Sequence, residues 1–142
     1  MKRFFNFAFL YFILAMVGGV FYREFTKFFN FSGRTTLAFV HVHLLVLGTF
    51  LFLLLALFSI NTNLLDQKGL RTFLILYQIA LPLMVVMMVI RGILQVLEFP
   101  LSNSMNSAIS GIAGVSHILM AISFIVLFCI LKKCKITTIS QH

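Results

Sequence analysis

Four long apolar stretches, separated only by short polar segments, constrain this chain more than any other feature. They cover residues 4–22, 37–60, 72–97 and 108–131. A membrane-spanning helix needs roughly 20 mostly apolar residues, so each stretch predicts one span. With 61% hydrophobic and 10% charged residues and a mean hydropathy of +1.10, the chain is far more apolar than a soluble domain, of which about a quarter is charged. We therefore expect an all-α integral membrane protein with one four-helix transmembrane domain over residues 1–142.

Turn-forming residues mark the boundaries between these stretches. The connections read NFSGRTT, NTNLLDQKG and EFPLSNSMNS, which are typical of loops and helix caps. The basic start and apolar body of the first stretch also fit a signal peptide. No A-x-A cleavage site occurs before Tyr22, which favours a retained first helix.

Basic residues are distributed unevenly between the two ends of the predicted helices. One side would carry Lys2, Arg3, Lys68, Arg71, Lys132, Lys133 and Lys135, and the other Arg23, Lys27 and Arg34. Since Lys and Arg favour the cytoplasmic side, we expect both termini in the cytoplasm and a multi-pass location in the plasma membrane. The +8 net charge then reflects topology and contact with the anionic lipid bilayer, and no nucleic-acid partner is expected.

Three histidines interrupt the apolar stretches. His41, His43 and His117 are expected at similar depths in the outer half of the bilayer, near Arg91. Ionisable residues in a membrane are costly and mark functional sites, and imidazole binds transition metals and haem iron and also transfers protons. His41 and His43 lie about 200° apart around a helix. They would not chelate one small ion together, but each could serve a separate large planar ligand.

The string HVHLLVLGTFLF, residues 41–52, resembles the helix of the haem-copper oxidase catalytic subunit that carries an H-x-H motif. The resemblance implies that His41 binds a high-spin haem and His43 a low-spin haem. The sequence lacks the His-His pair and the His-x-x-x-Tyr pattern of the oxidase copper centre, so we assign no catalytic residue and favour a non-enzymatic role. The oxidase subunit is a pseudo-threefold arrangement of four-helix arcs, which implies a homotrimer here. Taken whole, the chain also resembles a family of small four-helix bacterial membrane proteins of unknown function.

The last apolar stretch, residues 108–131, offers a ligand for the opposite face of a haem. Ser110, Gly114, His117 and Ala121 share one helix face, where small residues leave room for a porphyrin or for a closely packed helix. Arg91 could bind haem propionates through charge-assisted hydrogen bonds. Its alternatives are pairing with Glu98 or extending toward the lipid headgroups.

The sequence thus predicts a membrane protein that binds non-covalent b-type haem, one or two per chain. The predicted iron ligands are His41, His43 and His117, with Arg91 and Gly114 beside the haem. The haem would serve electron transfer, haem sensing or haem handling. Two other classes remain open: a structural or accessory subunit without a cofactor, and a small transporter or proton-relay protein.

Cysteine and methionine offer weaker signals. Cys129 and Cys134 do not form C-x-x-C-H, so covalent haem attachment is not expected. Met84, Met87 and Met88 are expected to fill gaps in the helix packing, the usual role of methionine.

Overall fold

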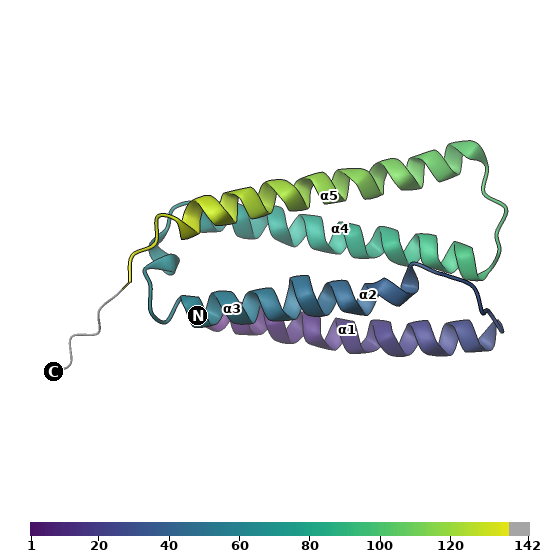
Figure 1. The fold of residues 1–142 in the computed structure, drawn as a ribbon, viewed down its shortest axis with the longest axis horizontal. Coiled ribbons are helices and arrows are strands. Elements are labelled where there is room, and N and C mark those ends of the chain that lie inside the picture. The colour runs from purple at the N-terminus through teal and green to yellow at the C-terminus, as the bar shows by residue number, and fades with distance from the viewer. Residues whose placement is uncertain (137–142) are drawn as a thin grey trace.

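The computed structural model describes residues 1–136, which form four long helices (Figure 1). The elements are α1 (Lys2–Phe28), α2 (Leu37–His43), η1 (Leu44–Phe50), α3 (Leu51–Phe58), η2 (Leu64–Asp66), α4 (Leu70–Val96) and α5 (Asn103–Leu131). α2, η1 and α3 follow one another without a break and make a single long helix. All four long helices are long and apolar enough to cross a membrane. The expected all-helical class and the number of candidate spans are therefore confirmed.

The helices pair as two antiparallel hairpins (Figure 1). α1 packs along α2, η1 and α3, and α4 packs along α5. α2 joins the hairpins because it contacts both α1 and α4. The N-terminus, the 59–69 connection and the last described residues lie at one end of the bundle, called the terminal end below. The connections 29–36 and 97–102 lie at the other, distal end.

Two helices extend beyond the predicted spans. α1 continues to Phe28 and α5 begins at Asn103, whereas the apolar pattern predicts an end at residue 22 and a start at residue 108. Polar side chains do not stop a helix where they can reach water. Ser102 defines the start of α5, because its hydroxyl accepts a hydrogen bond of 3.2 Å from the backbone N–H of Met105 in the manner of an N-cap.

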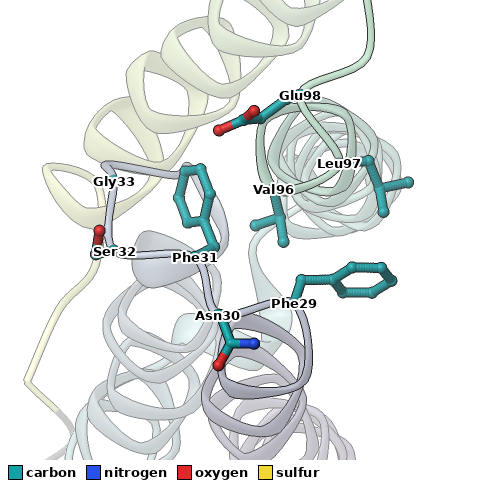
Figure 2. Close-up of a pocket in the computed structure, with 8 residues that line it drawn as sticks. All are labelled: Phe29, Asn30, Phe31, Ser32, Gly33, Val96, Leu97 and Glu98. Carbon is teal, nitrogen blue, oxygen red and sulfur yellow. The ribbon is translucent and has the colours of Figure 1, made fainter.

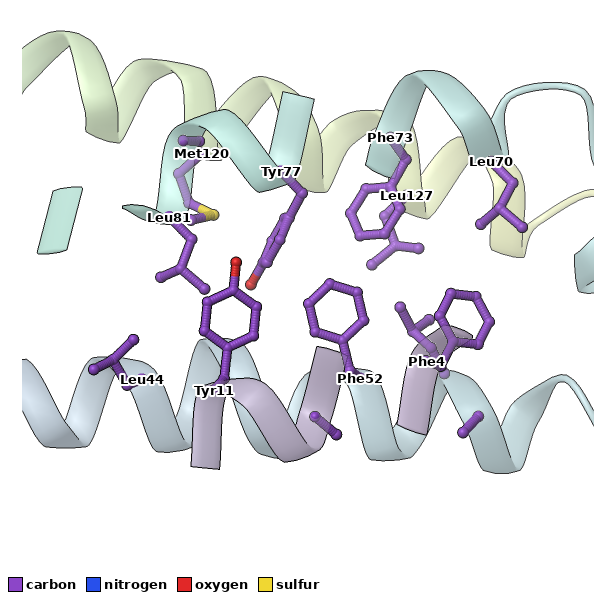
Figure 3. Packing of buried hydrophobic residues seen from close by; sticks show 14 of the residues in the cluster. Phe4, Tyr11, Leu44, Phe52, Leu70, Phe73, Tyr77, Leu81, Met120 and Leu127 are labelled. Atoms are coloured by element: carbon purple, nitrogen blue, oxygen red, sulfur yellow. The ribbon is translucent and has the colours of Figure 1, made fainter. Parts of the chain in front are cut away.

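Aromatic side chains hold the two hairpins together (Figure 3). The ring of Phe52 stacks on Tyr11 with centroids 5.9 Å apart and meets Tyr77 edge-on at 5.6 Å. Tyr77 in turn meets Phe124 edge-on at 5.8 Å. Because Phe52 and Tyr77 are fully buried, this aromatic chain connects α1, α3, α4 and α5 through the core.

The middle of the second long helix is wound as a π-helix, which the sequence pattern did not predict. A Cβ atom on Gly48 would lie 2.5 Å from the Cβ of Tyr11, so the absence of a side chain lets α1 approach closely. The Tyr77 hydroxyl donates a 2.7 Å hydrogen bond to the carbonyl of Leu47. The Thr49 hydroxyl contacts the carbonyl of Leu44 at 3.5 Å. Side chains thus help to satisfy the carbonyls of the widened turns, which matters where no water is available.

α4 and the start of α2 touch at backbone distance. The Thr35 hydroxyl donates a 3.0 Å hydrogen bond to the carbonyl of Gly92. A Cβ on Gly92 would lie 2.7 Å from the backbone nitrogen of Leu37. Gly92 therefore sets how closely the two hairpins approach at the distal end.

Replacing Gly92 by Ala is expected to lower the free energy of unfolding by about 1–3 kcal/mol, the usual cost of overpacking. Gly19→Ala is the matched control, because a Cβ there would meet His41 at an ordinary 3.7 Å and Ala favours the helix. Denaturant unfolding of both variants in one detergent measures the difference. Equal stability of the two variants would contradict the tight α2–α4 contact.

Candidate functional site

Hydrogen bonds to α4 align α2 and α5 at the same depth. The Thr36 hydroxyl on α2 donates to the carbonyl of Met88 at 2.7 Å. From the other side, Arg91 Nη2 donates to the Ser110 hydroxyl of α5 at 2.7 Å. His43 follows Thr36 by seven residues and His117 follows Ser110 by seven. At 1.5 Å per residue, both histidines lie about 10 Å closer to the terminal end than these bonds.

The same spacing places the two histidines on the flanks that face α4. Residues seven apart lie almost on the same face of an α-helix. His43 therefore shares the face of α2 through which Thr36 contacts α4, and His117 shares the face of α5 through which Ser110 contacts Arg91. α4 packs against both helices. His43 and His117 thus lie at one level on either side of α4.

The imidazoles of His43 and His117 are held in the same way. Nδ1 of His43 lies 2.8 Å from the carbonyl of Phe39, and Nδ1 of His117 lies 2.7 Å from the carbonyl of Ala113. A carbonyl only accepts, so Nδ1 is the donor in both hydrogen bonds, and in a neutral ring Nε2 then carries the lone pair. This is the tautomer that a metal-binding Nε2 requires, and such a bond to a backbone carbonyl fixes the ring orientation.

His41 differs from the other two histidines. It lies against Gly19 of α1, whose ideal Cβ would be 3.7 Å from its ring. Its Nδ1 is buried and has no hydrogen-bond partner among the described residues. His41 therefore points toward α1, away from His43, as the two-residue spacing predicts, and lacks the carbonyl contact that orients its neighbour.

Arg91 contacts α5. Besides Ser110, its Nη2 lies 3.4 Å from Oδ1 of Asn106. Within residues 1–136, the only ion pair joins Arg23 to Glu24, at 3.8 Å, so Arg91 and Glu98 do not form the salt bridge that was one alternative. The Arg91 charge is satisfied by neutral oxygen atoms and remains half-buried.

Gly114 lies on an open surface. It is exposed, and a Cβ atom on it would have no neighbour within 4 Å, as is also true of Gly111. His117 is exposed beside it. Packing within this bundle therefore does not explain these glycines, and the surface is free for a ligand or a second chain.

The other candidate ligands take no part in this arrangement. Met84 and Met87 are buried in the core, and Cys129 and Cys134 are free thiols. Burial raises the pKa of the Cys134 thiol, which keeps it protonated and unreactive. Across the described residues no three His, Cys, Asp or Glu side chains converge on a point where they could hold a metal ion.

A family model described as "Protein of unknown function (DUF2871)" matches residues 1–134. The chain belongs to this family. No curated protein and no solved structure matches it. The match confirms the resemblance of the whole chain to a family of unknown function, whereas the likeness of residues 41–52 to the oxidase helix stays a prediction.

In this DUF2871 chain, sequence reasoning missed the residues that set the register of the site. Thr35, Thr36 and Gln95 bind α2 to α4: the backbone N–H of Thr36 donates to Oε1 of Gln95 at 2.8 Å, beside the two threonine hydroxyl bonds. The TT pair looks like an ordinary helix cap in the sequence. The available signal was the position of Thr36, a polar residue seven residues before His43.

Removing the Ser110 hydroxyl is expected to lower the free energy of unfolding by about 1 kcal/mol, because a hydrogen bond to the Arg91 guanidinium is lost. Ser107→Ala, at an exposed position on the same helix, is the matched control. Glu98→Gln should not change stability through Arg91. Unfolding in detergent tests all three. A larger loss in Glu98→Gln than in Ser110→Ala would contradict the observed pairing.

Proposed function

We propose that this protein is a membrane b-type haem-binding protein in which His43 of one chain and His117 of a neighbouring chain are the axial ligands of one haem. One observation carries the proposal: both rings lie at one level and donate Nδ1–H to a backbone carbonyl. Each Nε2 lone pair is thereby left available to iron. Two imidazoles satisfy the axial requirement of a haem, so a cluster of three side chains is not needed.

The surrounding residues fit the same ligand. Arg91 reaches the flank of α5 that carries His117, about 10 Å closer to the distal end, and its guanidinium can donate to a propionate. The open surface at Gly114 leaves space for a flat macrocycle beside His117. A mostly apolar wall of membrane helices would exclude water from the site. Bound haem would supply one-electron transfer or the ability to sense small ligands.

His41 is proposed as the ligand of a second haem on the α1 side of α2, which the oxidase resemblance implies. The neighbour of His41 on α1 is Gly19, which places no side chain against the ring. Because Nδ1 of His41 has no carbonyl partner, this ring is less firmly oriented than the other two. We therefore expect weaker retention of haem at His41.

We further propose that the chain assembles as a homotrimer in the plasma membrane, with both termini in the cytoplasm. His117 is exposed on the outer surface of the bundle, and a polar ring facing hydrocarbon is unfavourable. With haem beside Gly114, the open surface at Gly111 still allows another helix to approach closely. Closed cyclic symmetry is the usual way for identical chains to bury such a surface.

Protein produced with haem available is expected to show a Soret band with a low-spin spectrum, and acidified organic solvent should extract the pigment. His43→Ala and His117→Ala should each abolish the low-spin signal, because six-coordinate bis-imidazole ligation needs both rings. His41→Ala is the matched control and should leave this signal unchanged. Folded, monodisperse wild-type protein that stays colourless would overturn the proposal.

Native mass spectrometry in mild detergents is expected to show three chains with haem attached. The proposed contact surface can be tested with Gly111→Leu, which adds a bulky side chain where the bundle itself has open space. This variant should shift the complex toward monomer while the monomer keeps its helical content. A haem-loaded monomer that persists at every protein concentration would show that one bundle is sufficient.

A further inference from the structure

A pocket separate from the histidine site lies at the distal end, between the end of α1 and the end of α4 (Figure 2). Its volume is about 480 Å³. It is lined by Phe29, Asn30, Phe31, Ser32, Gly33, Val96, Leu97 and Glu98. None of these residues belongs to the histidine site.

The pocket is formed where two helices terminate in the same way. Asn30 follows α1 with φ 50°, and Glu98 follows α4 with φ 49°. The next backbone N–H after each returns to the helix: Phe31 donates to Thr26 at 2.9 Å and Phe99 to Leu94 at 3.1 Å. This is the hydrogen-bond pattern of a Schellman motif, whose left-handed position is usually occupied by glycine.

Both helix ends bring negative potential to the pocket. The C-terminus of an α-helix is equivalent to roughly half a negative charge, and the first two residues beyond each of α1 and α4 line this pocket. The Glu98 carboxylate adds a full negative charge, and it forms no ion pair within residues 1–136. Lys27, in the last turn of α1, lies outside the lining, so among the described residues Glu98 is the only charged side chain that lines the pocket and it favours a cation there. Arg34, the residue after Gly33, is the nearest basic residue along the chain and is exposed outside the lining.

The aromatic lining favours an organic cation over a metal ion. Figure 2 shows the Phe31 ring and the Glu98 carboxylate pointing toward the same space. The Phe31 ring lies over Gly33, where a Cβ would meet its Cζ at 2.7 Å, so the ring is held in place. Aromatic faces attract ammonium groups, whereas calcium takes six to eight oxygen ligands and only one carboxylate is present here.

We propose that this pocket binds a small organic ammonium group, with the Glu98 carboxylate as its counter-ion and the Phe31 ring against its methyl or methylene groups. Either a free amine or the ammonium headgroup of a lipid provides this chemistry. The position at the end of two membrane helices makes both accessible. The site does not depend on haem.

The left-handed backbone conformation at Glu98 allows two different substitutions that remove the carboxylate. A glutamate at φ 49° is strained relative to glycine. Glu98→Gly should therefore stabilise the fold while removing the counter-ion, whereas Glu98→Gln keeps the side-chain shape and removes only the charge. Loss of binding in both variants would separate the role of the carboxylate from any effect on folding.

Calorimetric titration of the full chain in maltoside detergent, with choline and with ethanolamine as probes, tests the free-amine source. Native mass spectrometry after purification from phosphatidylethanolamine or phosphatidylglycerol nanodiscs tests the lipid source. We expect saturable binding of an amine or selective retention of phosphatidylethanolamine. Either signal should weaken at least tenfold in Glu98→Gln and Glu98→Gly and several-fold in Phe31→Leu.

Glu24→Gln is the matched control, because Glu24 lies near the same end of α1 but pairs with Arg23 and is not part of this pocket. It should bind like the wild type. Absence of both signals in the wild type would overturn the proposal. So would equal binding by wild type and Glu98→Gln, or equal loss in Glu24→Gln.

Discussion

Four long helices that are apolar enough to cross a membrane must pair their backbone polar groups within the protein, and this constraint explains most of the structure. Regular helical winding satisfies it by default, except where Pro82 inside α4 lacks the N–H donor. In the π-helix η1, a side chain from another helix provides a partner, because the Tyr77 hydroxyl of α4 donates a hydrogen bond to the Leu47 carbonyl. Tyr77, Thr35 and Thr36 thus act as hydrogen-bond donors to the backbone, whereas Tyr11 donates to the Gln78 side chain.

The same donors fix how the hairpins align. Thr35 and Thr36 contact carbonyls of α4 on one side, and Arg91 contacts Ser110 on the other. Each pair is a polar contact within apolar surroundings, so moving α2 or α5 along α4 by one helical turn would leave several polar groups without hydrogen-bond partners. The register of α2, α4 and α5 is consequently well specified, and the equal depth of His43 and His117 follows from it.

The sequence was sufficient to predict the four spans, their short connections and the opposite directions of His41 and His43, because these depend on hydrophobicity and helical periodicity. It was insufficient where partners come from distant segments. The π-wound stretch LLVLGTF is almost entirely apolar, so no periodicity reveals its winding, and its close contact with Tyr11 at Gly48 involves a distant segment. The sequence could not predict the partner of Arg91 either, since Glu98 and Ser110 are both plausible until the position of α5 is known.

The π-helix also separates two regions of one long helix. A π segment accommodates an additional residue relative to regular α winding. Residues before it present the histidines, while Phe52 and Leu55 after it belong to the core. Deleting one residue from this segment would restore regular winding and leave the two halves facing as they do now, because the widened turns absorb the additional residue. A single-residue insertion or deletion in this segment can therefore occur during evolution while the histidine-bearing half and the core-packing half keep their faces.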